Sequence, residues 1–226
     1  MIVNMEAPQP RRRRPAKAAY HHGDLPRALV EAAWRLIEEG GAPRLTLRAA
    51  AEAAGVSAAA PYRHFVDREA LLAAVLAAGF RELARRTDEA RRAAREPLAG
   101  LRAVGLAYVA FAADHPRIYR LMFGGECDKA RHPDLLAAGH AAMSVLIESV
   151  AACRAAGRLV TDDVLAVALA GWSLSHGLAS LHADGMLAGM PGTLPDTAAT
   201  LIGFLVDGVR SRPARKATSS TRRRKA

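Results

Sequence analysis

Proline, glycine and acidic residues divide the sequence into segments rich in alanine and leucine, most of them as long as a helix. Alanine and leucine have high intrinsic helix propensities, proline is favoured in the first turn of a helix, and glycine is favoured just past its end. No stretch of useful length alternates apolar and polar side chains as a half-buried strand does. The sequence therefore predicts an all-α protein. The expected helices cover residues 25–39, 47–54, 58–65, 68–87, 98–114, 116–123, 133–157, 162–183 and 195–210.

Short polar side chains precede several of these segments, where they can accept hydrogen bonds from the free N–H groups of a first turn. The expected N-caps of the first four helices are Asp24, Thr46, Ser57 and Asp67. Three later helices are expected to begin at or near Pro97, Pro116 and Pro133. The expected glycine stops are Gly40-Gly41, Gly55, Gly157 and Gly185.

The positive charge of the chain is concentrated at its two ends. The net charge is +10; residues 1–20 contribute +4 and residues 210–226 contribute +8, so the body between them is slightly acidic. Blocks of like charge are usually disordered and often bind nucleic acid. We therefore expect a disordered basic arm at 1–19 and a disordered basic tail at 211–226. The tail either adds affinity for DNA phosphates or only aids solubility. The arm residues expected to contact DNA are Arg11, Arg12, Arg13, Arg14 and Lys17.

The stretch AEAAGVSAAAPYRHF, residues 51–65, has the pattern of two short helices joined by a tight turn. Gly55 can adopt the positive φ that ends the first helix, and Ser57 can cap the second. Such a pair forms a helix-turn-helix, whose second helix enters the major groove of DNA, although an ordinary helical hairpin is the alternative. Pro61 costs one early backbone hydrogen bond, which local tightening or a shifted helix start could absorb. The candidate DNA-binding residues are Thr46, Ser57, Ala58, Ala59, Tyr62, Arg63, His64 and Arg68.

Several motifs follow one another between residues 20 and 80: a Thr-Leu-Arg helix start, an Ala-Gly-Val-Ser turn, a Tyr-Arg-His-Phe end and an Arg-Glu-Ala-Leu-Leu entry to the next helix. Together they resemble the TetR-type bacterial transcription regulators. Arg68 departs mildly from that pattern, which more often has Lys there. The resemblance implies a three-helix, helix-turn-helix DNA-binding domain over residues 20–87.

The segments HPRIYRLMFGG and GWSLSHGLASL resemble a C-terminal subclass of that family named for its Trp-His-Gly motif, here Trp172, His176 and Gly177. The resemblance implies a helical-bundle domain over residues 97–210 that binds an effector and forms a homodimer. Such a dimer reads a palindromic operator on double-stranded DNA, and an unknown small molecule releases the repressor from it. The candidate effector-binding residues are Tyr108, Phe111, Tyr119, Met122, Phe123, Met143, Ile147, Trp172 and His176.

The last two expected helices are the implied dimer interface. One stripe of residues 162–183 carries Leu165, Leu169, Trp172 and His176, and another carries Ala168, Gly171, Ser175 and Leu178. Small residues allow helices to approach closely, so either stripe could meet a second chain. A helix that packs only within its own chain is the alternative.

Three other function classes fit less well. No histidine pair has the i, i+4 spacing that places two metal ligands on one helix face, so we predict no metal site and no cofactor. A hydrolase would need a glycine where Ser175 stands in GWSLSHG and a strand before it, so we predict no catalytic residues and no enzyme. A nonspecific, charge-driven DNA-binding protein is the main alternative, because the basic ends alone would suffice for it.

The expected location is the bacterial cytoplasm. Cys127 and Cys153 are too few for a disulfide framework, and the basic start is not followed by an apolar export segment. Residues 164–183 lack charge, but their serine and histidine side chains favour a helix buried in protein over a membrane span. The effector, the operator sequence, the regulated genes and the choice between repression and activation are not determined by the sequence.

Overall fold

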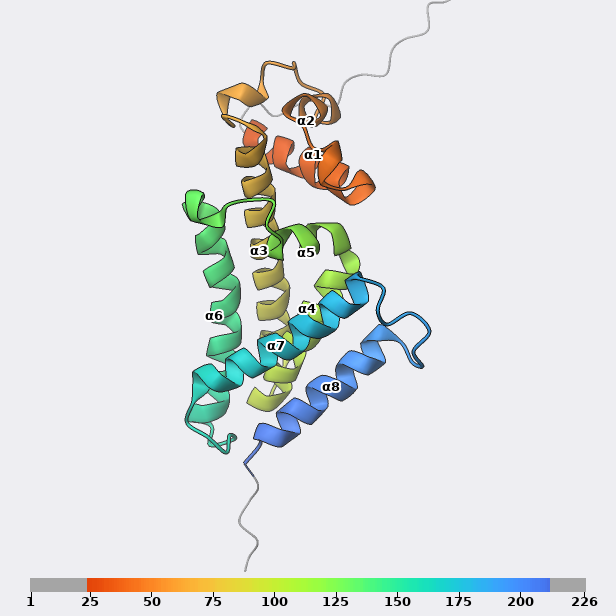
Figure 1. Ribbon diagram of the computed structural model, residues 1–226. Helices are drawn as coiled ribbons and strands as arrows, with labels where there is room; N and C mark the ends of the chain where they lie inside the picture. Colours follow the sequence, from red (N-terminus) through yellow and green to blue (C-terminus); the bar gives the residue numbers. More distant parts are fainter. Residues whose placement is uncertain (1–23, 212–226) are drawn as a thin grey trace, which may run out of the picture.

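The computed structural model describes residues 24–211, and these form an all-helical protein with no strand (Figure 1). The helices are α1 (Leu25–Gly40), α2 (Leu47–Ala53), α3 (Arg68–Ala93), α4 (Pro97–Asp114), α5 (Pro116–Phe123), α6 (Pro133–Ala155), α7 (Val164–Ala183) and α8 (Leu194–Val209). Three single 3₁₀ turns, η1 (Ala42–Arg44), η2 (Pro61–Arg63) and η3 (Lys129–Arg131), connect them. The expected basic arm and all of the expected tail except Ser211 lie outside the described residues.

The predicted all-α fold is confirmed, and α3 joins its two parts. Its first turns lie with α1 and α2 at one end of the molecule and pack on α1, whereas the rest of it packs most extensively on α6 and α4 (Figure 1). One apolar cluster runs without a break from Leu29 and Ile37 of α1 to Phe111 and Met122 in the second part. A second cluster lies between α4, α6, α7 and α8. The continuous first cluster couples the two parts, because neither can shift without disturbing it.

The predicted polar caps of three helices are confirmed. Asp24 accepts a hydrogen bond from the Arg27 amide at 3.3 Å, and Thr46 accepts one from the Ala49 amide at 2.9 Å. Asp67 accepts one from the Ala70 amide at 2.8 Å. Each cap satisfies an N–H group that has no partner within its own helix.

The prediction of a helix over residues 58–65 is wrong. Only Pro61–Arg63 forms a helical turn, of the 3₁₀ type, and Ser57 makes no capping side-chain bond within residues 24–211. The Ala60 amide instead donates to the Ser57 carbonyl at 3.0 Å, and the His64 amide donates to the Pro61 carbonyl at 2.9 Å. Pro61 is the physical reason, because it lacks the N–H that an α-helical ladder needs at this position. Gly55 takes a φ of 71° at the turn before this segment, as expected.

Helix α3 is longer than predicted, since it continues past Thr87 to Ala93. The Thr87 hydroxyl does not stop the helix, because it bonds back to the Leu83 carbonyl of its own helix at 2.8 Å. Ion pairs at helical spacing support the added turns: Arg85 binds Glu89 at 2.8 Å, and Arg92 binds Asp88 at 2.7 Å. No glycine or proline interrupts the segment before Pro97.

Helices α4, α6 and α7 are long and apolar enough to cross a membrane by length and composition alone. In the fold they contact one another. Only 28% of the apolar window of α7 is buried, however. Part of this uncharged helix therefore faces outward within the single chain.

Candidate functional site

The segment between α2 and α3 presents polar side chains at one end of the molecule. Tyr62 is 63% exposed, and Arg63 and His64 are exposed beside it. Buried Pro61 and Phe65 flank them and fix the segment to the core. Ser57, Ala58 and Ala59 are exposed at the start of the same segment, so the predicted surface residues do share one loop.

Arg68 directly follows this segment and Thr46 caps the helix before it, but the structure gives Arg68 an internal role. Its guanidinium donates from Nε to the Leu45 carbonyl at 2.9 Å and from Nη2 to the Ala42 carbonyl at 2.7 Å. The side chain therefore ties the start of α3 to the turn that precedes α2. Thr46, which follows Leu45 directly, is held by this bridge while its side chain caps α2.

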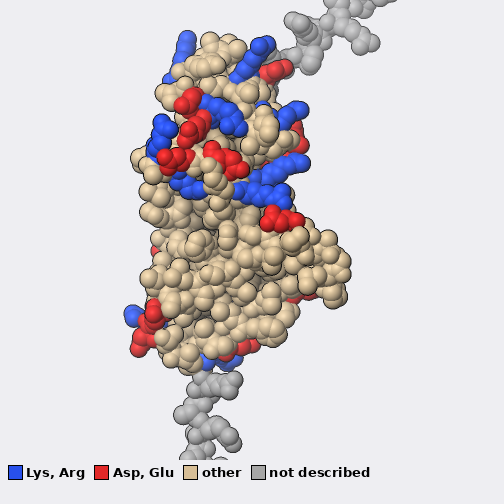
Figure 2. Space-filling model, viewed as in Figure 1, with Lys and Arg blue, Asp and Glu red and all other residues tan. Residues whose placement is uncertain are grey.

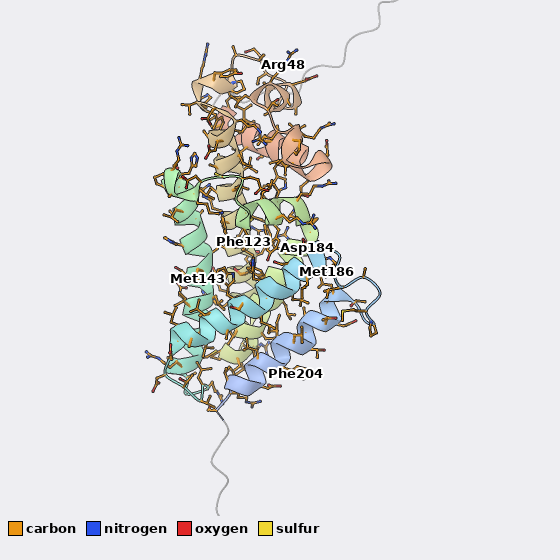
Figure 3. All side chains as sticks on the ribbon, in the orientation of Figure 1. Arg48, Phe123, Met143, Asp184, Met186 and Phe204 are labelled. Carbon is orange, nitrogen blue, oxygen red and sulfur yellow. The ribbon has the colours of Figure 1, made fainter. Side chains whose placement is uncertain are left out.

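Arg48 is an exposed cation of the same surface that was not predicted from the sequence. It projects from α2 near the end of the molecule (Figure 3) and forms no ion pair within residues 24–211. Its position two residues after the Thr46 cap was the available signal, because the first turn of a helix is where anions bind. Charged side chains of both signs gather over this half of the visible face, with Asp and Glu between the Lys and Arg, whereas the surface over α7 and α8 is largely uncharged (Figure 2).

The second candidate site is a partly open cavity of about 80 Å³ lined by residues of α3, α4, α6, α7 and α8 and by the last residue of α5. Its lining residues are Phe80, Leu83, Thr87, Leu101, Val104, Gly105, Tyr108, Phe123, Gly139, Ala142, Met143, Leu146, Gly171, Trp172, Ser175, Ile202, Leu205 and Val206. The wall is almost entirely apolar, as in most small-molecule sites. The volume is below that of typical ligand pockets, so a ligand larger than a few water molecules requires side chains to move.

Four of the nine predicted effector-binding residues line this cavity: Tyr108, Phe123, Met143 and Trp172. Phe123 and Met143 belong to the larger part of the molecule (Figure 3), and both side chains are half-buried. The remaining five, Phe111, Tyr119, Met122, Ile147 and His176, do not line it. The α3 side chains of the wall were missed, because an apolar helical stripe gives no sign of the cavity it will face. The three lining glycines were missed because a search for large side chains cannot find them.

Ser175 supplies a polar group to the apolar wall. It is only 4% exposed, and its hydroxyl makes no hydrogen bond to another described residue. The other two lining hydroxyls have partners: that of Thr87 donates to the Leu83 carbonyl, and that of Tyr108 is bonded to His176 Nδ1. A buried hydroxyl without a partner costs free energy, so Ser175 is suited to bind a hydrogen-bonding group inside the cavity.

A polar network centred on His176 lies directly behind the cavity. Nδ1 of His176 is 3.0 Å from the Tyr108 hydroxyl and 2.7 Å from the Tyr119 hydroxyl. Burial lowers the pKa of His176, and burial raises the pKa of Tyr108, so at neutral pH both groups are uncharged. The imidazole can therefore accept at Nδ1 from a tyrosine hydroxyl. His176 thus fixes Tyr108, which lines the cavity, relative to Tyr119 on α5.

Helix α5 connects this network to the first part of the molecule. The Ile118 amide donates to the Glu38 carboxylate of α1 at 3.2 Å, and the Arg117 guanidinium donates to the Glu38 carbonyl. On the other side, the Arg120 guanidinium donates to the Ala183 carbonyl at the end of α7. One short helix therefore contacts both α1 and α7.

One small cluster of potential metal ligands lies at the junction of the two parts, formed by Glu69, Cys127 and His132. The sequence predicted no metal site because only ligand pairs on a single helix can be recognised from their spacing. These three residues come from the first turn of α3, the segment after α5 and the start of α6. Burial and the neighbouring Glu69 carboxylate raise the pKa of the Cys127 thiol.

Two family models match the chain on either side of this junction. Residues 29–75 match the model of bacterial regulatory proteins of the tetR family, and residues 101–205 match a tetracyclin repressor-like C-terminal domain. With the exposed segment and the cavity, these matches define a DNA-binding transcriptional regulator. The chain belongs to the TetR family.

Solved structures share the whole fold. A Rhodococcus sp. RHA1 protein of unknown function is 34% identical, with a TM-score of 0.76, over 86% of this chain and 100% of that one. The TetR family transcriptional regulator PfmR from Thermus thermophilus is 19% identical, with a TM-score of 0.61, over 79% and 97% of the two chains. The fatty acid degradation regulator FadR from Bacillus halodurans is 15% identical, with a TM-score of 0.63, over 81% and 99%. No curated protein sequence gives a significant match.

Proposed function

We propose that this regulator is a homodimeric repressor that binds a palindromic operator and is released from it by a small, largely apolar effector bound in the cavity. The observation that carries the proposal is the position of α3. Phe80, Leu83 and Thr87 of this helix line the cavity, and Asp67 and Arg68 at its start adjoin the exposed Tyr62 segment. A ligand that moves the α3 wall therefore acts on the DNA-facing end through one continuous element.

The surface of α7 and α8 supports the proposed dimer. Leu165 and Leu169 of α7 are 57% and 45% exposed, and Phe204 of α8 is 69% exposed. The surface over these two helices is largely free of charge in the single chain (Figure 2). An exposed apolar patch of this kind marks a protein–protein contact, and a second copy would cover it with the same patch. The stripe of Ala168 and Leu178, in contrast, is buried within the chain.

The cavity also limits the chemical class of the effector. Its wall offers aromatic and aliphatic contacts together with the unpaired hydroxyl of Ser175. We expect an apolar molecule that carries one hydrogen-bonding group near Ser175. Since the free cavity measures only about 80 Å³, binding has to displace flexible wall residues such as Met143 and Leu146. The effector would thus contact the displaced wall and not the wall of the free protein. Allosteric release requires such a difference in binding between two conformations.

We further propose that the protein acts in the cytoplasm and catalyses no reaction. We assign its second part to the Trp-His-Gly subclass; in support, the matched range 101–205 includes Trp172, His176 and Gly177. The basic arm, with Arg11–Arg14 and Lys17, is proposed to add phosphate contacts beside the operator.

The test is a gel shift of the full chain on DNA from beside its own gene, at near-physiological salt with excess random competitor. A discrete complex that survives competition, and that Tyr62→Ala weakens without lowering the unfolding temperature, supports sequence-specific binding. A complex that random DNA removes from every fragment, and that is lost when residues 1–19 and 211–226 are deleted, would contradict the proposal in favour of charge-driven binding.

Two variant pairs test the dimer and the cavity. Phe204→Asp is expected to halve the mass in sedimentation equilibrium, whereas Leu136→Asp, on the exposed face of α6, is expected to leave it unchanged.

Once a screen against the operator complex gives an effector, Ala142→Leu in the cavity wall should abolish the response to that effector and keep operator binding. Ala141→Leu, its exposed neighbour, should respond like the unmodified chain. Equal responses from both would show that the effector binds elsewhere.

A further inference from the structure

Three side chains with different metal-binding groups converge where the DNA-facing part meets the larger part of the molecule. The Cys127 sulfur, a Glu69 carboxylate oxygen and a ring nitrogen of His132 all lie within 4.8 Å of one another. Among residues 24–211, no other group of three such ligands is as close. We propose that Glu69, Cys127 and His132 bind one divalent transition-metal ion, with zinc as the best fit.

The separation of the imidazole and carboxylate ligands matches a tetrahedral centre. His132 Nε2 is 3.4 Å from Glu69 Oε1. Two ligands at about 2.0–2.1 Å from zinc, separated by the tetrahedral angle, lie roughly 3.4 Å apart. The thiolate forms a longer bond of about 2.3 Å, so its separation from the other two ligands is somewhat larger. An ion can therefore enter with small side-chain movements, and water would complete the fourth position.

The burial of Cys127 is the second observation that points to a ligand. Its side chain is 5% exposed, and its thiol makes no hydrogen bond to another described residue. It lies beside the carboxylate and imidazole of the cluster rather than among apolar groups alone. The other cysteine, Cys153, is fully buried in the second apolar cluster. Thiolate, imidazole and carboxylate together form a ligand set that favours zinc over magnesium or calcium.

The surroundings hold the ligands in place and partly oppose a cation. The Asp128 amide donates to Glu69 Oε1 at 3.3 Å, which orients the carboxylate. Arg131 approaches Glu69 Oε2 at 3.8 Å, but its side chain is 70% exposed and can turn into solvent. The Lys129 ammonium is bound to the Gly124 carbonyl at 2.9 Å. On binding, the thiol proton of Cys127 passes to the buffer, and its sulfur donates to the ion.

The position of the site gives the ion a role in regulation. Glu69 belongs to the first turn of α3, next to Arg68 and Asp67, whereas Cys127 and His132 flank the η3 turn before α6. A bound ion would cross-link the start of α3 to the segment between α5 and α6. It would thus fix one placement of the DNA-facing part relative to the cavity-bearing part.

The experiment uses the full chain, purified without an affinity tag that contains histidine, and stripped of metal by chelator dialysis. Zinc uptake is measured by competition with a chromophoric chelator, and cobalt(II) serves as the spectroscopic probe. We expect one ion per chain, a thiolate-to-cobalt charge-transfer band, and an unfolding temperature that rises with zinc concentration. Absence of uptake, or uptake without the thiolate band, would overturn the proposal.

Matched variants identify the ligands. Loss of a residue that only hydrogen-bonds to a metal ligand weakens metal binding ~10–100-fold. Cys127→Ala and His132→Gln each remove a ligand itself and are expected to weaken zinc binding by more than that. Cys153→Ala and His140→Gln, the latter at an exposed position on α6, should bind as the unmodified chain does. If Cys127→Ala does not fold, His132→Gln and the cobalt spectrum decide the question. Unchanged zinc affinity in His132→Gln would place the ion elsewhere and contradict the assignment.

Discussion

Arg68 offers a sharp test, because a phosphate contact and an internal bridge predict different results for its removal. The sequence pattern suggested that its guanidinium meets DNA. The structure shows two of its nitrogens donating to the Leu45 and Ala42 carbonyls, at 2.9 and 2.7 Å. We therefore expect Arg68→Ala to destabilise the fold and to weaken DNA binding only through that loss.

The expected size follows from the two bonds. A hydrogen bond from a charged donor contributes about 1.5–3 kcal/mol when shielded from water, and an exposed one contributes less. The bond to Leu45 is partly buried and the bond to Ala42 is exposed, so about 2 kcal/mol for both together is reasonable. In a chain of this size, 1 kcal/mol corresponds to about 2–4 °C, which predicts a fall of roughly 4–8 °C in the unfolding temperature. Arg68→Lys should recover little of it, since one ammonium cannot reproduce the planar fork.

The assay combines thermal unfolding with operator affinity measured at several salt concentrations. Arg63→Ala is the matched control, because Arg63 is exposed and forms no ion pair in the described part of the chain. If Arg63 contacts a phosphate, its removal lowers the slope of log affinity against log salt by about 1 and leaves stability unchanged. For Arg68→Ala we expect an unchanged slope. A lower slope with an unchanged unfolding temperature would refute the bridging role.

Three further predictions concern stability. Gly55→Ala should cost roughly 1–2 kcal/mol in chemical denaturation, because its φ of 71° lies in the left-handed region, although its new methyl group would meet no atom within 4 Å. Gly105→Ala should lower the stability by about 1–3 kcal/mol, since its Cβ would lie 3.0 Å from Ile202 Cδ1. Gly177→Ala is its control: the new Cβ meets open space, and the substitution should raise the stability by up to about 1 kcal/mol. A hydrogen bond from Arg85 lowers the pKa of Glu82 from its ordinary value of 4.5 to about 2. The ionised Glu82 therefore stabilises the fold fully above pH 4.5, and this contribution is lost as the pH falls towards 2. Glu82→Gln should flatten that part of the stability–pH curve.

The helix boundaries that were predictable are those that local chemistry determines. Asp24 and Asp67 cap helices because a carboxylate can reach an amide three residues ahead, and Pro116 and Pro133 begin them because their fixed φ suits a first turn. The segment after Ser57 was mispredicted because two local rules compete there. A serine cap favours a helix, whereas Pro61 removes a backbone hydrogen bond from it, and in the fold only Pro61–Arg63 is helical.

The candidate sites were less predictable than the helices. Exposed side chains of one segment, such as Tyr62 and Arg63, could be found because neighbours in sequence remain neighbours in space. The cavity and the Glu69 cluster join residues far apart in the chain, and their position depends on how helices cross. His176 is an example of a residue whose place could not be predicted. Its motif suggested direct contact with an effector, but it lies behind the cavity wall, bonded to Tyr108 and Tyr119.

The length of α3 sets the scale of any movement at the DNA. Its 26 residues make a rod of about 39 Å, at 1.5 Å per residue. Leu83 in the cavity wall and Arg68 at the DNA-facing end are about 22 Å apart along this rod. As a lever of that length, it would convert a tilt of about 5° at the cavity into a shift of about 2 Å at Arg68. The exposed side chains of the adjoining segment, such as Tyr62 and Arg63, would move with Arg68, and a hydrogen bond from either of them to DNA spans only about 3 Å, so a shift of that size would break it. An effector can therefore be small and still break the operator complex.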